Sequence, residues 1–234
     1  MTPPTKLFVA LVLSACCALR ATAEFKTLQI VPTFKPTLSP VMLMDGVTEG
    51  KVIFAIDVSD EGKITDTIVL GTTHRGMVRI GREILDGAEI TPAQLNGQPV
   101  ACQTEVTIDY HASGVVISRP AIIDLDQHVQ QRMGYRMKLN QKFARDLDVL
   151  PPRLVTVMPK YGVDAEKQGV RGKVRVHFYI DETGAVRMPS VEGEAHPYLS
   201  AIALEAMRGW RFAPPMSHGK PALMAARQDF SFSR

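Results

Sequence analysis

The sequence predicts an α+β fold in which one small domain occurs twice, each copy a three-stranded antiparallel sheet with a helix packed on one face. Three observations predict it. An offset of 122 residues aligns residues 50–110 with residues 172–232 without a gap and with 13 identities, many of them glycine or proline. Within each copy, apolar residues alternate with polar ones as in half-buried strands. A single apolar stripe at helical spacing follows the first two strands. Duplication explains such a repeat better than chance.

The first 23 residues predict a secretory signal peptide. Lys6 precedes an apolar run over residues 7–19, and Ala21 and Ala23 frame a small-x-small cleavage site. The run is too short to span a bilayer. A second interpretation stays open, because residues 13–16 match a lipobox in which Cys16 would be lipidated. Both place the protein outside the cytoplasm: periplasmic or exported in the first case, an outer-membrane lipoprotein in the second.

Charge and cysteine content exclude several classes of function. The chain has 27 basic and 24 acidic residues, and removal of the leader with Lys6 and Arg20 leaves a net charge of only +1. That balance predicts no nucleic-acid partner, and membrane association only through lipidation. Cys102 is the one cysteine after the leader, so no intramolecular disulfide is expected. It sits in a strand-like run and is interpreted as a small buried hydrophobe, with a reactive thiol as the alternative.

The hairpin of each copy is visible in its alternation. Apolar residues recur at every second position over residues 52–58 and again over 174–180, which indicates a strand with one buried face. Gly62 and Gly184 then supply turns, and β-branched runs at residues 64–70 and 186–191 predict the second strands.

A helix and a last strand complete each copy. His74 and His196 precede the two helical stripes and are interpreted as caps, while Gly87 and Gly209 end the helices. Turns at residues 96–97 and 218–219 lead to last strands over 100–110 and 222–232. We therefore expect a first domain at 27–112, a connector at 113–148 and a second domain at 149–234.

The second copy resembles the TonB C-terminal domain family. Its motifs are Met158-Pro159-Lys160-Tyr161, a Gly-x-x-Gly-x-Val sequence from Gly169, the stretch Trp210-Arg211-Phe212 and the pair Gly219-x-Pro221. The resemblance implies a short helix before the sheet. The first copy is divergent, with residues 88–90 reading Ala-Glu-Ile in place of the Trp-Arg-Phe stretch. Two further departures are Gly162, where the motif ends in proline, and the absence of a proline-rich spacer after the leader.

The family resemblance implies a binding mode. Such domains bind a short segment of outer-membrane transporters by strand addition to the last strand of the sheet, and an exposed sheet edge is a template for another strand. The residues that this places at the partner are Met158, Pro159, Lys160, Tyr161, Ala226, Arg227, Gln228, Asp229, Phe230, Ser231 and Phe232. Phe230 and Phe232 are expected to face the core and Asp229 and Ser231 to face outward, so that the backbone makes the contact.

No other constellation carries chemistry. The histidine and cysteine spacings match no metal site, and no nucleophile elbow, phosphate loop or dinucleotide fingerprint occurs. The acidic pairs at 124/126 and 146/148 are interpreted as solvated loop residues, and Trp210 as a core residue. Within the connector, residues 114–118 predict a strand and residues 124–132 a short helix. The basic run over 132–145 is either solvated or a contact surface for anionic lipid or a partner. We expect neither metal nor cofactor, and no enzyme activity.

The sequence thus favours a non-catalytic cell-envelope adaptor that binds a protein or peptide through a sheet edge. The alternative is an auxiliary component of a TonB-dependent outer-membrane transport system. A metal-binding accessory or an enzyme is less favoured, and a purely structural role stays open. An unpaired edge can also meet its own copy, which would give a homodimer.

Overall fold

The computed structural model describes residues 24–33, 37–44, 46–111, 114–118, 138–162 and 169–233. Several expectations lie outside these residues: the leader with Cys16, Ala21 and Ala23, the helix over 124–132, the acidic pair at 124/126, the first part of the basic run, and the short helix after Tyr161. No helix in the described part of the chain is long and apolar enough to cross a membrane.

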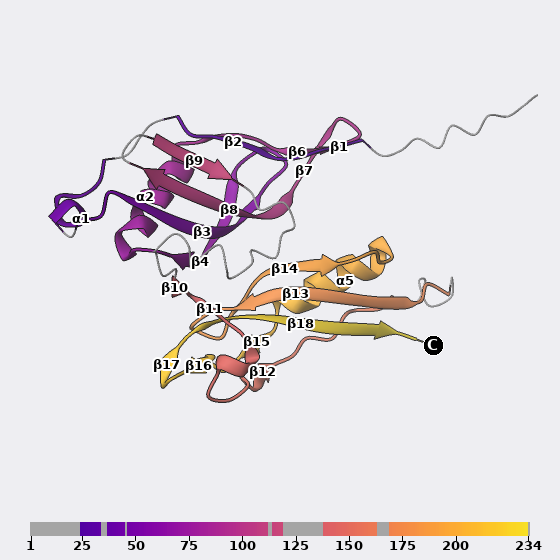
Figure 1. Cartoon of the computed structure of the whole chain (residues 1–234). Coiled ribbons are helices and arrows are strands. Elements are labelled where there is room, and N and C mark those ends of the chain that lie inside the picture. The colour runs from indigo at the N-terminus through magenta and orange to yellow at the C-terminus, as the bar shows by residue number, and fades with distance from the viewer. Residues whose placement is uncertain are drawn as a thin grey trace, which may run out of the picture.

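The first unit is built on an antiparallel sheet with strand order β10-β4-β3-β8-β9 (Figure 1). A short helix precedes this sheet, α2 follows its first hairpin, and smaller strands pair outside it. The elements are β1 (Phe25–Lys26), β2 (Gln29–Val31), α1 (Pro40–Met44), β3 (Glu49–Val58), β4 (Ile64–Thr72), α2 (Arg75–Asp86), β5 (Glu89–Thr91), β6 (Ala93–Leu95), β7 (Gln98–Val100), β8 (Cys102–His111), β9 (Gly114–Ser118) and β10 (Lys138–Leu139).

The second unit has a four-stranded sheet with the order β11-β18-β13-β14. β11 lies parallel to the start of β18, and the other pairs are antiparallel. The elements are β11 (Gln141–Lys142), a 3₁₀ turn (Ala144–Asp146), β12 (Arg153–Val155), β13 (Gly172–Ile180), β14 (Val186–Glu192), α5 (Pro197–Arg208), β15 (Arg211–Phe212), β16 (Met216–Ser217), β17 (Lys220–Pro221) and β18 (Leu223–Phe232).

The two units share their element order and their strand register. The series from β3 to β8 recurs as the series from β13 to β18, and β2 pairs with β5 as β12 pairs with β15. Val52 lies opposite Ile108, and 122 residues further on Val174 lies opposite Phe230. Both turns between the short strands begin with a positive-φ residue before glycine, at Asn96 and His218.

Each helix packs on one face of its sheet, as the alternation predicts. Alternate residues of β3 from Val52 to Val58 are buried against α2, and alternate residues of β13 from Val174 to Ile180 are buried against α5. The histidine caps are also confirmed. His74 Nδ1 accepts from the N–H of Gly76 at 3.1 Å, and His196 Nδ1 accepts from the N–H of Tyr198 at 3.3 Å. Cys102 is partly buried against the first core.

The main sheet of each unit has more strands than the three that the sequence predicts: among the described residues, five in the first unit and four in the second. β9 pairs with β8, β10 with β4, and β11 with β18. Residues 114–118 therefore form the expected strand, but as part of the first sheet. β10 and β11 are two residues each, and a strand that short has no alternation for a sequence reading to detect.

The helix-free faces of the two sheets pack against each other, which the sequence did not predict. A shared apolar cluster joins Ala55, Ile68 and Leu70 of the first unit to Tyr179, Met188 and Leu223 of the second. Both faces of β3 and β13 are therefore partly covered. Alternation predicts one buried face of a strand. It does not reveal a second face that the other unit covers, because the covering residues are few and scattered.

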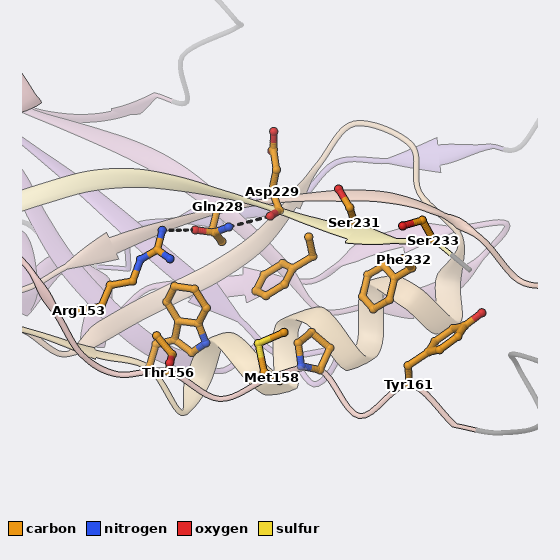
Figure 2. A pocket seen from close by; sticks show the side chains of 12 residues that line it. Arg153, Thr156, Met158, Tyr161, Gln228, Asp229, Ser231, Phe232 and Ser233 are labelled. Atoms are coloured by element: carbon orange, nitrogen blue, oxygen red, sulfur yellow. Dashed lines mark hydrogen bonds between the residues drawn. The ribbon is translucent and has the colours of Figure 1, made fainter.

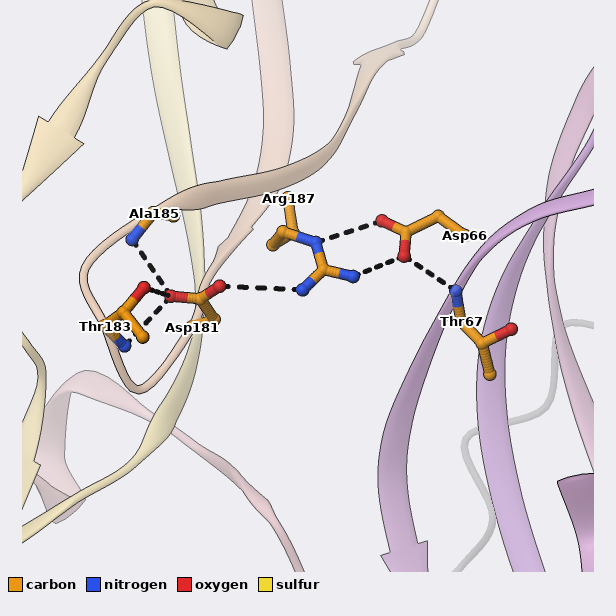
Figure 3. A network of polar contacts seen from close by, with 6 residues as sticks. All are labelled: Asp66, Thr67, Asp181, Thr183, Ala185 and Arg187. Atoms are coloured by element: carbon orange, nitrogen blue, oxygen red, sulfur yellow. Dashed lines mark hydrogen bonds and ion pairs between the residues drawn. The ribbon is translucent and has the colours of Figure 1, made fainter.

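A polar network borders this interdomain cluster (Figure 3). Arg187 of β14 donates from Nε to Asp66 of β4 at 3.0 Å, makes a second hydrogen bond to the same carboxylate, and lies 3.5 Å from Asp181. Gln103 of β8 donates to the carbonyl oxygen of Met188 at 3.0 Å. Burial at the interface, together with repulsion from Asp66, raises the pKa of Asp57. Burial, and to a lesser extent Glu105, raises the pKa of Tyr179 to about 12.

Candidate functional site

A groove of about 490 Å³ runs between the C-terminal half of β18 and an extended segment, residues 153–161, that comes before β13 in the sequence. Figure 2 shows Arg153, Thr156 and Met158 on one side and Gln228 of β18 on the other, with the Asp229 side chain pointing away from the groove. The lining residues are Arg153, Thr156, Met158, Pro159, Tyr161, Trp210, Gln228, Asp229, Phe230, Ser231, Phe232 and Ser233.

Aromatic side chains form the apolar base of the groove. Trp210 and Phe230 meet edge to face with ring centroids 5.8 Å apart, and Tyr161 lies 5.8 Å from Phe232 at a tilt of 41°. Trp210, Phe230 and Phe232 are buried, while Asp229 and Ser231 are exposed. The alternation expected along the last strand is therefore confirmed, and so is the core position of Trp210.

The extended segment is fastened to the core by Trp210. The indole N–H of Trp210 donates to the carbonyl oxygen of Val157 at 2.8 Å, and the side chain of Val157 lies against Gly209. A Cβ atom at Gly209 would come within 2.6 Å of Val157 Cγ2. The glycine that ends the helix therefore also lets this wall of the groove approach closely.

A second fastening lies at the other end of the segment. The Tyr161 hydroxyl donates to the carbonyl oxygen of Val170, and the N–H of Gly162 donates to the Tyr198 hydroxyl at 2.9 Å. Proline has no N–H to donate. The glycine that stands where the family motif has proline thus contributes a contact to α5 that proline would remove.

The charged residues of the lining are Arg153 and Asp229. Arg153 stacks on the Trp210 ring at 4.9 Å and donates to Gln228 Oε1 at 2.7 Å. Asp229 accepts two hydrogen bonds from Arg175 of β13, at 2.7 and 3.1 Å, and these hydrogen bonds lower the pKa of its carboxyl. Because the Asp229 charge is already paired, Arg153 is the charge that the lining offers to a ligand.

Sheet edges differ in how they are protected. The first sheet is bounded by the short strands β9 and β10. In the second sheet β14 contains Pro189, next to the positive-φ residue Met188 and an irregularity in its pairing with β13. Proline and bulges are the usual protection of an edge. β11 pairs only with Leu223 and Met224 of β18. The remainder of β18 is the long edge to which no described strand pairs.

The groove gathers most, not all, of the residues predicted for partner binding. Met158, Pro159, Tyr161 and residues 228–232 line it, whereas Lys160, Ala226 and Arg227 do not. Arg227 instead pairs with Glu192 across the sheet at 3.0 Å. Arg153, Thr156 and Ser233 were missed, because single residues in an extended stretch carry no pattern. Trp210 was placed in the core alone, yet it also lines the groove.

The acidic pair at 146/148 has a structural role. Asp148 accepts from the N–H groups of Gly219 and His218, at 2.9 and 2.8 Å, and these bonds lower the pKa of its carboxyl. The Asp146 carboxylate accepts from the N–H of Phe143 at 3.2 Å. Both residues thus hold backbone around the β16–β17 turn and the 3₁₀ turn instead of being merely solvated.

Comparison with known families bears on this unit. Residues 157–233 match the family described as Gram-negative bacterial TonB protein C-terminal, so the second unit carries a TonB C-terminal domain. Domains of this family interact with proteins, outer-membrane transporters among them, which supports a protein-interaction role and an envelope location. Comparison with curated proteins gave no match.

Proposed function

We propose that the protein is a non-catalytic adaptor of the cell envelope that binds an extended segment of a partner protein at the open edge of β18. The observation that carries the proposal is the coincidence of that edge with the groove. β18 offers backbone groups to an added strand, and the aromatic base beside it offers apolar contacts to the side chains of that strand.

The lining indicates the chemistry of the segment. Apolar residues that face the groove would contact the aromatic base, and an acidic residue near Arg153 would meet a guanidinium that stacking on Trp210 already orients. Pre-ordering of Arg153 reduces the entropy that binding must overcome.

A more specific candidate is an auxiliary of a TonB-dependent outer-membrane transport system. The family match over residues 157–233 favours it. In this role the partner is the segment of an outer-membrane transporter, and recruitment, not energy transduction, is the task. Either role is consistent with the shared element order and register of the two units, which support two tandem TonB-C-like domains at 27–112 and 149–234 with a connector at 113–148.

In-cell photo-crosslinking tests the function. A photoreactive amino acid replaces Met158, which lines the groove and is 75% exposed. The matched control replaces Met44, which is 87% exposed and lies on α1 of the first unit. The expected result is an adduct from position 158, absent from position 44, whose partner peptide maps to one extended segment.

Three outcomes are informative. A transporter segment in the adduct supports the auxiliary role, and a segment of another envelope protein supports the broader adaptor. Adducts of the protein with itself alone would mean that the edge joins two copies, and the proposal of partner capture would be wrong.

A further inference from the structure

We infer that β9 is a built-in occupant of the first unit's binding edge, so that the protein captures one partner segment, at β18, and the first unit shows which stretch of the edge that segment covers. The inference rests on the proposed function. Its starting point is an asymmetry: the outer edge of β8 is paired with β9, whereas no described strand pairs with the corresponding stretch of β18.

The residues involved correspond one to one. β9 pairs with Thr107, Ile108, Asp109, Tyr110 and His111 of β8. The positions 122 residues further on are Asp229, Phe230, Ser231, Phe232 and Ser233, and all five line the groove. The first unit therefore fills with its own chain the stretch of edge that the second unit presents as a groove.

The first unit specifies the stretch of edge that a partner would cover. β9 places Ile117 opposite Ile108 and Gly114 opposite His111. Transferred to the second unit, the partner lies along residues 229–233, at the end of β18. Only two residues join β8 to β9, and so short a connection makes the pair antiparallel, so the stretch of edge carries over to an untethered segment and the direction does not.

The composition of β9 indicates what the groove accepts. Its sequence is Gly-Val-Val-Ile-Ser, and the three β-branched residues in it favour an extended strand. Ile117 is partly buried against the first core. Its counterpart in a bound partner would lie opposite Phe230, where the aromatic base favours a large apolar side chain. The partner class is thus an extended segment with about three consecutive β-branched residues.

A peptide of residues 112–120 is the probe, titrated into the mature full-length protein and followed by amide NMR. We expect saturation at one peptide per chain, with shifts at residues 229–233 and none at residues 107–111. The free peptide lacks the tether that gives β9 a high effective concentration, so its Kd should be on the order of 0.1 mM or weaker. Trp210, the one tryptophan in the chain, gives an independent fluorescence signal inside the groove.

Matched variants test the side-chain contacts in the groove. The peptide with I117D should bind at least about tenfold more weakly, as should the protein with M158D, whereas M44D should bind as the natural chain does.

Shifts at residues 107–111 or saturation at two peptides would overturn the inference. Absence of binding would also overturn it, and the crosslinking result then separates the two proposals. If position 158 still captures a partner segment in cells, the proposed function stands and only the β9 analogy is wrong. If it captures none, both fail.

Discussion

The indole N–H of Trp210 donates to the carbonyl oxygen of Val157 at 2.8 Å, and this bond ties one wall of the groove to the core of the second unit. Trp210 follows Gly209, the glycine that ends α5, and Val157 belongs to the extended segment that faces β18. The same ring supports Arg153. One side chain thus couples the stability of the domain to the shape of its candidate binding site.

The substitution W210F should therefore lower the stability of the second unit and weaken binding in the groove. Loss of the hydrogen bond to Val157 and poorer filling of the core should lower the free energy of unfolding by about 1–2 kcal/mol. Urea denaturation followed by circular dichroism measures this loss. Binding of a groove ligand should weaken as well, because the wall and Arg153 lose their support. Unchanged affinity in the folded variant would mean that the wall is ordered without Trp210.

The two histidine caps predict equal small losses. H74A and H196A each remove a side-chain acceptor from the first turn of a helix, and each should cost about 1 kcal/mol of unfolding free energy. H74N and H196N are the matched controls, because asparagine is also a good cap. Alanine variants as stable as the asparagine variants would show that the rings do not act as caps.

Glycine is required at position 184 for two reasons, its positive φ angle and the close approach of a neighbouring backbone, whereas at position 219 only the φ angle requires it. Gly184 has φ +85°, and a Cβ atom there would lie 2.0 Å from the carbonyl oxygen of Phe212, whereas Gly219 has φ +71° and open space around it. G184A should therefore cost about 3 kcal/mol or more, and G219A only about 1 kcal/mol. Thermal unfolding compares the two, and similar losses would contradict the close approach.

The interdomain network predicts a measurable coupling. Arg187 and Asp66 come from different units and are both about one third exposed, at 35% and 28% of their side-chain area. Solvent screening at that exposure keeps the expected coupling energy in a double-mutant cycle of R187M and D66N to about 1 kcal/mol. High salt should reduce it. A coupling of zero at low salt would mean that the network does not hold the units together.

His177 predicts a loss of stability in acid. Burial, helped by Arg227 and opposed by Glu192, lowers the pKa of His177 below its ordinary value of 6.5. The folded protein thus favours the neutral ring, and the unfolded chain binds the proton more tightly. Stability should fall as the pH drops below about 6.5 toward the lower folded pKa. H177Q should lack this part of the pH dependence when denaturation midpoints are compared at pH 7.5 and 5.5. An unchanged profile would contradict the assignment.

Much of the fold could be predicted from the sequence, because in each unit the local sequence signals agree with the strands, turns and helix that form. Alternation gave the strands, repeated glycines gave the turns, and the histidine caps were visible before the helical stripes. The added strands β10 and β11 could not be found, since two residues have no period. The interdomain cluster was hidden for another reason: Ala55 and Tyr179 occupy positions that alternation assigns to solvent, and only the packing of the second sheet buries them.

The family resemblance placed residues 158–161 and 226–232 at a partner. The structure brings Met158, Pro159, Tyr161 and residues 228–232 to one groove and leaves Lys160, Ala226 and Arg227 outside it. Arg153 escaped prediction because its position depends on stacking with Trp210, which lies 57 residues away in the sequence. Contacts of that kind have no local signature.

The most direct test of strand addition is hydrogen–deuterium exchange of the mature protein with and without the partner segment captured at position 158. We expect slower exchange in the peptide that covers residues 225–233, because an added strand protects the outward N–H groups of β18. The β14 edge, which carries Pro189, should exchange as before. Protection on β14, or none on β18 at saturating segment, would contradict binding at the open edge.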